Sequence, residues 1–251
     1  MNTQLILRLG EFHTAMVFLV VIGKRFRDAG LHDIAIESGI VAEGSINTVL
    51  NGHQYNQSLR CHKIIAEAMH HLQLHDYLEQ LPESGLDAAF GLIATIRDSF
   101  PGRFMECINQ ESVRQFIEGY QTYILEKCND NETYAFWTSY FEMVELLLLF
   151  IRAAREGDWQ LHVSCVRDMI PWFFSYGRIN YSRYLPLYYL EMRDLERTHP
   201  GIHDELMAEK FAVQRQQHHE FAMTPCDQII EQTFNRDSKT KGGVASITLN
   251  K

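Results

Sequence analysis

Apolar residues recur at helical intervals through most of the chain, and this pattern predicts a mainly α-helical protein. In the segment from about Asn56 to Tyr77 they stand three or four residues apart along one face. The segment Asn131–Arg155 is apolar nearly all round, so we expect it to be the central, most buried helix of a bundle. Further helices are predicted at His13–Asp28, His32–Glu37, Ser45–Leu50, Leu86–Ser99, Glu111–Cys128, Trp159–Trp172 and Tyr181–Thr198, and a short one begins at Ile202–Glu205. Pro186 either bends its helix or marks where that helix begins.

Strands are expected only near the two ends of the chain. Gln4–Gly10 has the composition of a short strand, although no partner strand is near it in the sequence and a lone strand is not stable. Lys210–Gln214, His219–Met223 and Val244–Lys251 are the other candidates for strands or extended segments. The chain is therefore expected to divide into residues 1–30, a helical domain at 31–209, and residues 210–251.

One short helix, at Pro225–Phe234, carries two acids four residues apart. Thr224 suits the N-cap, Pro225 the first turn, and Asp227 the third position of a capping box. In one interpretation Asp227 caps this helix and Glu231 is solvated. In the other, Glu231 is a metal ligand, and the further carboxylates that two-metal phosphoryl transfer needs come from strands elsewhere.

The composition is that of a globular protein inside the cell. Hydrophobic residues make up 46% of the 251 and the formal charge is −9, which argues against a broad phosphate-binding surface. The five cysteines are scattered, as free thiols of a reducing compartment would be. The N-terminus does not read as a signal peptide, and the longest apolar runs are too short to span a bilayer. We expect a nuclear or cytoplasmic protein without a membrane partner.

Three segments carry a resemblance to a known family. "LGEFHTAMVFLVVIG" (residues 9–23), "IAIESGIVAEGSINTVLNGHQYNQSLRCHKII" (34–65) and "DQIIEQTFNRDSKTKGG" (227–243) resemble a family of transposon-derived proteins of animal genomes whose biochemistry is undefined. That family is distantly similar to RNase H-like transposases, in which a helical insertion precedes the last core helix. Its pattern often reads Gly-Gly-Phe-His, and here Glu11 replaces the second glycine, which puts that turn in question.

The resemblance implies a fold and a site. The fold would be a helical bundle with a few short strands near the termini, the remnant of an RNase H-like core. Glu231 would be the last acid of an Asp-Asp-Glu set and a ligand of Mg²⁺, with His13 beside it as a second ligand. Longer members have early strands and Asp residues before the segment that matches residues 9–14. The resemblance therefore implies that this chain lacks independent catalysis, while complete relatives cut or join DNA with Mg²⁺.

The segment Pro171–Glu196 combines many aromatic residues with arginines. Such a combination can stack on single-stranded bases, and the other interpretation is a packed helix junction. Arg178, Arg183 and Arg193, with Lys239 and Lys241 of the following loop, are the residues predicted to contact nucleic acid.

Two histidines, His71 and His75, have a spacing that can bind zinc from one helix. Ordinary packing or surface positions are the favoured interpretation, because no further cysteine or acid completes a recognisable ligand set.

A second hypothesis treats the chain as a helical module that binds a protein partner, or itself through open sheet edges. The transposase hypothesis makes a geometric prediction that separates the two. It requires residues 4–10 to lie beside the helix Pro225–Phe234, so that His13 or Glu11 approaches Glu231.

Overall fold

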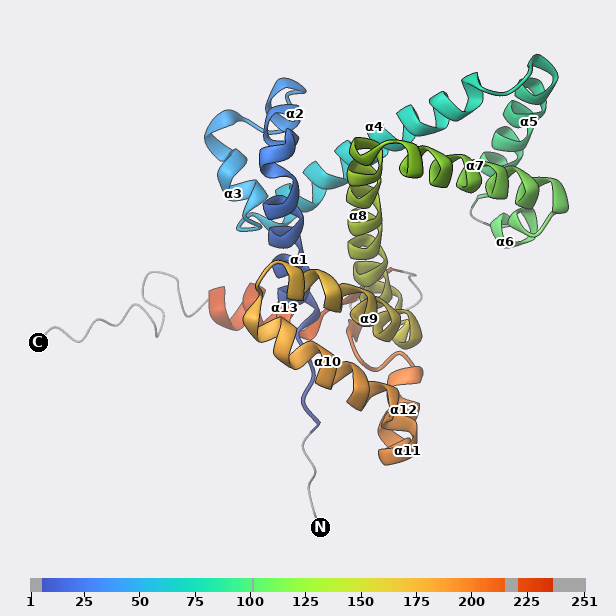
Figure 1. Ribbon diagram of the computed structural model, residues 1–251. Coiled ribbons are helices and arrows are strands. Elements are labelled where there is room, and N and C mark those ends of the chain that lie inside the picture. The colour runs from blue at the N-terminus through green and yellow to red at the C-terminus, as the bar shows by residue number, and fades with distance from the viewer. Residues whose placement is uncertain (1–5, 101, 215–220, 237–251) are drawn as a thin grey trace, which may run out of the picture. The chain divides into compact units, whose positions relative to one another are not determined.

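The computed structural model describes residues 6–100, 102–214 and 221–236. Within these ranges the chain forms thirteen α-helices and one two-stranded sheet, so the expected mainly α fold is confirmed (Figure 1). Two compact units are present, one made from residues 1–61 and 143–251 and the other from residues 62–142. The division predicted at residues 30 and 209 stays a prediction.

The predicted helices are present, with small shifts at their ends. The first unit contains α1 (Glu11–Phe26), η1 (Arg27–Ala29), α2 (Leu31–Glu37), η2 (Glu43–Ser45), α3 (Ile46–Leu50), α9 (Trp159–Ser175), α10 (Ile179–Arg193), α11 (Leu195–Thr198), α12 (Pro200–Met207), α13 (Cys226–Ile230) and the π-helical turn η3 (Glu231–Asn235). The second contains α5 (Glu83–Ser99), α6 (Phe104–Ile108) and α7 (Glu111–Asp130). Two long helices, α4 (Tyr55–Glu79) and α8 (Glu132–Glu156), contribute residues to both units.

Helix α1 is at the centre of the first unit because one whole face of it is apolar. Phe18, Leu19, Ile22 and Phe26 are fully buried, and the Phe18 ring meets that of Phe173 in α9 edge to face at 5.5 Å. Gly23 lets α1 approach the end of α3, since a Cβ there would lie 2.0 Å from the Leu50 carbonyl oxygen. The backbone of α3 is thus fixed against α1.

Helix α8 is buried along one stripe rather than all round. Fully buried residues recur along it at Tyr140, Met143, Val144, Leu147, Phe150, Ala153 and Ala154, while Glu145 and Leu149 are exposed. The helix is also long and apolar enough to cross a membrane. The core helix of a soluble protein can have the same length and composition. Its buried stripe is what the amphipathic pattern of a core helix requires.

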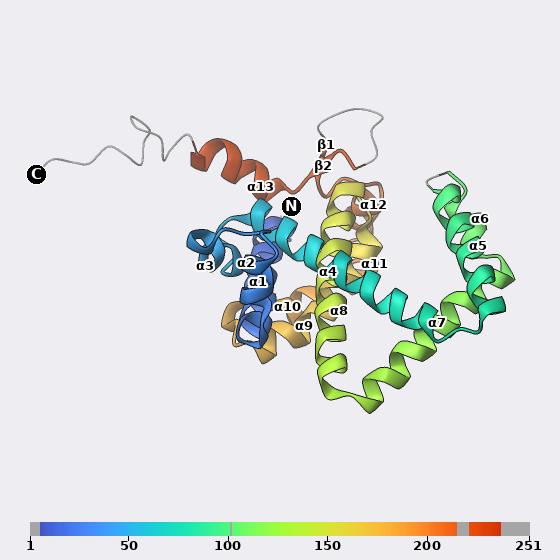
Figure 2. The ribbon, with the colours of Figure 1, turned by 90° about the horizontal axis from the view of Figure 1, so that it is seen from above.

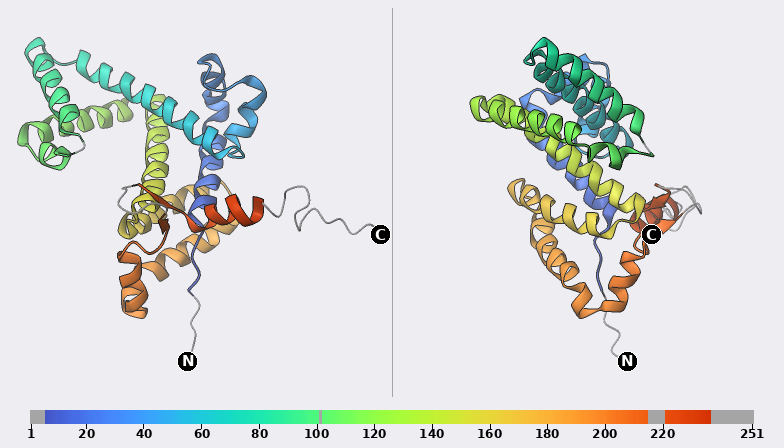
Figure 3. Two further views of the ribbon diagram at one scale, coloured as in Figure 1. Left: turned by 180° about the vertical axis from the view of Figure 1, so that it is seen from behind. Right: turned by 90° about the vertical axis from the view of Figure 1, so that its right-hand side faces the viewer.

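The predicted helix Tyr181–Thr198 is two helices. Helix α10 begins at Ile179, so Pro186 is interior and does not mark the start, and Asp194 separates α10 from α11. Helices α9 and α10 form an antiparallel hairpin, and the chain then returns through α11 and α12 (Figure 3, right). Ile6 and Leu7 line a hollow with Leu190 of α10 and Leu195 of α11.

The sheet is smaller than expected. Val213–Gln214 (β1) pairs antiparallel with Met223–Thr224 (β2), so two predicted extended segments each retain a two-residue strand (Figure 2). The strand predicted at Gln4–Gly10 is wrong for its described part, because residues 6–10 form no ladder. Side chains hold this segment instead: Arg8 Nη1 donates to the Phe211 carbonyl at 2.8 Å. The strand predicted at Val244–Lys251 lies outside the described residues.

The second unit has a core that includes polar side chains. His62 is fully buried, and its Nδ1 lies 3.0 Å from the hydroxyl of Tyr140. Gln73 donates to Thr138 at 3.2 Å, and Tyr123 donates to Asp76. These bonds connect α4 to α7 and α8 within residues 62–142. The five cysteines of the whole chain are free thiols, as expected.

Two neighbouring phenylalanines test this account of the core. Phe173 is 0% exposed and Phe174 is 75% exposed. We expect Phe173→Ala to lower the free energy of unfolding by about 3–5 kcal/mol, because it leaves a cavity between α1 and α9. Phe174→Ala should change it by less than about 0.5 kcal/mol. Urea unfolding followed by circular dichroism measures both, and equal losses would contradict the packing described.

Candidate acid–imidazole site

The amino terminus of α1 has no cap from its own sequence. The N-cap position is Gly10, which has no side chain to accept hydrogen bonds from the first turn. The first N–H groups of any helix lack partners within the helix, so another group must satisfy those of α1.

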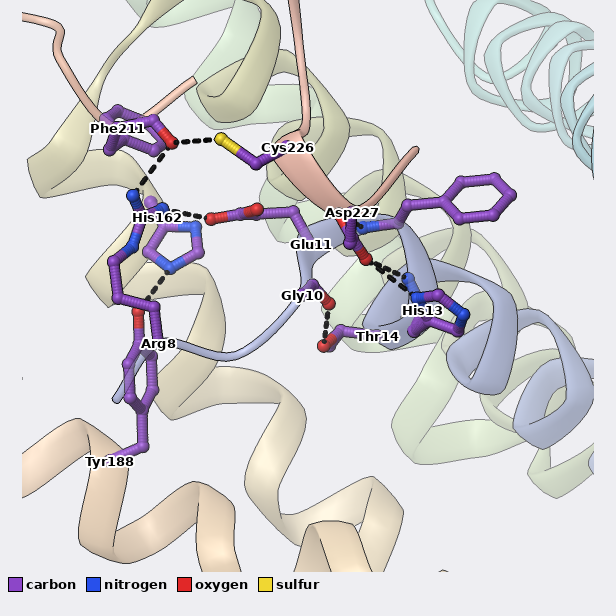
Figure 4. A network of polar contacts seen from close by, with 11 residues as sticks. Arg8, Gly10, Glu11, His13, Thr14, His162, Tyr188, Phe211, Cys226 and Asp227 are labelled. Atoms are coloured by element: carbon purple, nitrogen blue, oxygen red, sulfur yellow. Dashed lines mark hydrogen bonds and ion pairs between the residues drawn. The ribbon is translucent and has the colours of Figure 1, made fainter. Parts of the chain in front are cut away.

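Asp227 supplies that cap from the other end of the chain. Its Oδ1 accepts from the Phe12 backbone N–H at 3.2 Å, and its Oδ2 accepts from the His13 N–H at 3.0 Å (Figure 4). Gly10 is required for this arrangement, because a Cβ at that position would lie 2.3 Å from Asp227 Oδ2. The carboxylate also gains from the positive end of the α1 dipole.

This geometry corrects the expected capping box. Asp227 is a capping residue, but it caps α1 rather than the helix that contains it. Thr224 lies in β2, and the N-cap of α13 is Pro225, which makes no side-chain bond. The spacing of residues around Asp227 favoured a cap on its own helix. Spacing of this kind carries no information about a helix more than two hundred residues away in the sequence.

His13 joins the two acids. Its Nδ1 lies 2.9 Å from Asp227 Oδ2, and its Nε2 lies 3.5 Å from Glu231 Oε1. The side chains of His13, Asp227 and Glu231 are 49%, 17% and 30% exposed, so the cluster is open to solvent. The geometric requirement stated from the sequence is met at the C-terminal end of residues 4–10: Gly10 lies against Asp227 of α13, and His13 approaches Glu231.

Glu231 is oriented by an irregular turn. It begins the π-helical turn η3, and its Oε1 accepts from the Asn235 side-chain amide at 2.8 Å. A π turn inserts one extra residue and so re-aims the side chains that follow an α-helix. Here it follows directly on α13.

Glu11 lies on the opposite side of the α1 terminus, in a buried network. Its carboxylate is 4% exposed and accepts from Arg8 Nη2, and Arg8 Nη1 bonds the Phe211 carbonyl (Figure 4). Cys226 Sγ reaches the same carbonyl at 3.8 Å. The Arg8 guanidinium also lies 5.8 Å from the Trp159 ring centroid and 5.4 Å from that of Phe211. Glu11 therefore anchors the N-terminal segment through Arg8. The glutamate at this position does not prevent the turn before His13 from forming.

Burial perturbs the groups of this network. Desolvation raises the pKa of Glu11, although the nearby Arg8 charge opposes the rise. Desolvation, helped by Arg8, lowers the pKa of His162 to about 3. The His162 Nε2 lies 3.1 Å from the Tyr188 hydroxyl, and its ring stacks on Trp159 at 5.1 Å. His162 is thus a neutral core histidine that the sequence pattern did not single out.

The residues predicted to contact nucleic acid are only partly brought together. Arg183 is exposed on α10, Arg193 ends that helix with its guanidinium over Tyr189 at 5.9 Å, and Arg178 is half-buried just before it. Ten residues of helix separate Arg183 from Arg193, a distance of about 15 Å along the axis. Lys239 and Lys241 lie outside the described residues.

The sequence left a zinc site at two histidines of α4 open as the less favoured interpretation. His71 and His75 are exposed, and His75 Nδ1 lies 3.6 Å from Glu79 Oε1. Over the described ranges, no group of three or more His, Cys, Asp and Glu side chains is arranged to hold a metal ion.

Comparison with known proteins gives a family and no activity. The family model described as a domain of unknown function (DUF8702) matches residues 2–251. No curated protein matches the chain. No solved structure matches it either.

The cap supplied by Asp227 can be tested by its removal. We expect Asp227→Ala to lower the free energy of unfolding by about 1–2 kcal/mol, because two backbone N–H groups of α1 lose their acceptor. Gly10→Ala should also destabilise, since its Cβ displaces the same carboxylate. Glu231→Ala removes half-buried side-chain contacts to His13 and Asn235 and should cost less, about 0.5–1 kcal/mol. Urea unfolding of the three variants decides, and an unchanged Asp227→Ala would rule out the cap.

The buried histidines predict a loss of stability in mild acid. Burial lowers the pKa of His62 to about 4 and of His162 to about 3, whereas an unfolded histidine titrates near 6.5. As the pH falls below 6.5 the unfolded chain binds protons that the folded chain excludes, so stability decreases. Each histidine should cost about 1.5 kcal/mol between pH 6.5 and pH 5.

Replacing one buried histidine should remove its share of this pH dependence. Urea unfolding at several pH values should show a shallower slope for His162→Phe than for the wild type. The exposed His75→Gln is the control and should keep the wild-type slope. Equal slopes for all three proteins would show that His162 titrates normally in the folded chain.

Proposed function

The chain belongs to the DUF8702 family, whose name states no activity, and we propose that its acid–imidazole site is one part of a centre for metal-dependent DNA strand transfer or cleavage. Glu231 is the acid of this part and His13 is its neighbour. The proposal makes the chain transposase-derived and incomplete as a catalyst, because the remaining carboxylates of such a centre are not among its described residues.

One observation carries the proposal. His13 and Glu231 come from the two segments that resemble the motifs of transposon-derived proteins, and their side chains lie 3.5 Å apart. The segments are more than two hundred residues apart in sequence, so helical periodicity gives no reason for them to meet. The Asp227 cap explains why α13 lies against α1, and the proposal gives Glu231 a function beyond its bond to Asn235.

The proposed cation would be held weakly by two donors and completed by substrate. Both oxygens of Asp227 accept backbone N–H bonds, so this carboxylate is committed to the helix terminus. Glu231 and the Nε2 of His13 are the atoms that would hold Mg²⁺. Mg²⁺ in phosphoryl-transfer sites is held by one or two carboxylates together with substrate phosphates. When bound, it would neutralise charge that develops on a phosphate.

DNA as the substrate is supported by the position of the basic residues in the same unit. Arg178, Arg183 and Arg193 lie on or beside α10, which belongs to residues 143–251, as Glu231 does. This unit as a whole is close to neutral, so the arginines are not offset by a large acidic field. Contacts to the phosphate backbone through them would weaken as salt is raised.

The ligand role of Glu231 can be measured with Mn²⁺ as the probe. In calorimetric titrations the wild type should bind one Mn²⁺ weakly, with a Kd of about 1 mM, and a short DNA duplex should tighten this binding by supplying phosphate oxygens. Glu231→Ala should abolish that site. Because the Glu231 side chain is only half-buried, the substitution should leave the fold intact.

The matched control is Glu191→Ala, which removes an exposed glutamate of α10 in the same unit. It should bind Mn²⁺ as the wild type does. Identical titrations of the wild type and Glu231→Ala would eliminate Glu231 as a ligand and, with it, the metal-dependent function.

A further inference from the structure

The charge of the chain is divided unequally between its two units. Residues 62–142 contain 13 Asp and Glu against five Lys and Arg, a net charge of −8, while the whole chain carries −9. The other residues together therefore carry −1. The second unit, about one third of the chain, accounts for nearly all of its acidity, which argues against contact between this unit and DNA.

The same acidic unit has an apolar groove between α4 and α8. It has a volume of about 410 Å³, and its walls include Met69, Leu72, Trp137 and Phe141. Leu72 is 69% exposed, although it belongs to a helix whose other face is packed in the core. An apolar groove surrounded by charge is the usual form of a surface that receives an amphipathic helix.

The acids near the groove are not all neutralised inside the chain. Asp76, which lines the groove, accepts from Tyr123 and lies 3.7 Å from Lys127. Asp130 and Glu132 are exposed and flank Asn131, another residue of the groove wall. A ligand that fills the groove therefore meets a negative edge at the junction of α7 and α8.

We propose that this groove binds a basic amphipathic helix of a partner protein, with apolar anchors on one face and Lys or Arg on the other. The net charge of −8 selects a cationic partner over a neutral or acidic one. It also disfavours a second copy of this chain, because two such units would place −8 against −8. The inference concerns residues 62–142 alone and does not depend on the function proposed for Glu231.

A designed peptide pair tests the proposal with the full-length chain. The probe is a fluorescent 20-residue helix with leucines at helical spacing and lysines elsewhere, and its partner has glutamate in place of every lysine. Fluorescence anisotropy should show binding of the lysine peptide that weakens with added salt, and no binding of the glutamate peptide.

Two leucine variants locate the binding site. Leu72→Ser should weaken the lysine peptide about tenfold, because an apolar anchor loses its partner. Leu125→Ser is the matched control: Leu125 is 65% exposed on α7 in the same unit, does not line the groove, and should leave the affinity unchanged.

Three results would overturn the proposal. Equal loss in both leucine variants would place binding outside the groove. Equal binding of the two peptides would show that charge selects nothing. A dimer that sedimentation detects in the wild type and that Leu72→Ser abolishes would assign the groove to a second copy.

Discussion

The carboxylate of Asp227 satisfies the backbone at the start of α1, and much of the first unit depends on this contact. It requires glycine at position 10, since a larger residue would occupy the space of the carboxylate. It fixes the distance between α13 and α1, and so the position of His13 relative to Glu231. Helix α1 in turn supports α3 and α9 through Gly23 and Phe18. A single capping interaction thus connects the two ends of the chain to its core.

The N-terminal segment shows how a tail can be ordered without a strand. Its apolar composition predicted one, yet residues 6–10 make no ladder. Arg8 carries the ordering instead, through an ion pair with Glu11, a bond to the Phe211 carbonyl and the faces of two aromatic rings. Composition predicts a strand where residues prefer extended backbone. It does not reveal which side chain will donate a hydrogen bond to a carbonyl that is distant in the sequence.

Local periodicity predicted the helices because a helix buries a face that its own sequence defines. The site was harder to predict from the sequence. Gly10 has no side chain that would indicate a partner, and Asp227 already had a plausible role as a cap of its own helix. His62 and His162 are polar residues buried in an apolar core. Their burial is explained by their contacts with the hydroxyls of Tyr140 and Tyr188, which the sequence does not reveal. The proximity of His13 and Glu231 was expected from resemblance to other proteins, not from any pattern of residues.

The unequal distribution of charge between the two units bears on both proposals, DNA binding by one unit and binding of a basic helix by the other. A chain with a net charge of −9 is a poor candidate for DNA binding if that charge is spread evenly. Here nearly all of it belongs to residues 62–142, which leaves the unit that contains Glu231 and the arginines of α10 close to neutral. The two proposals therefore rest on different residues: the surface for a basic protein on residues 62–142, and the phosphate contacts on arginines whose own unit is close to neutral.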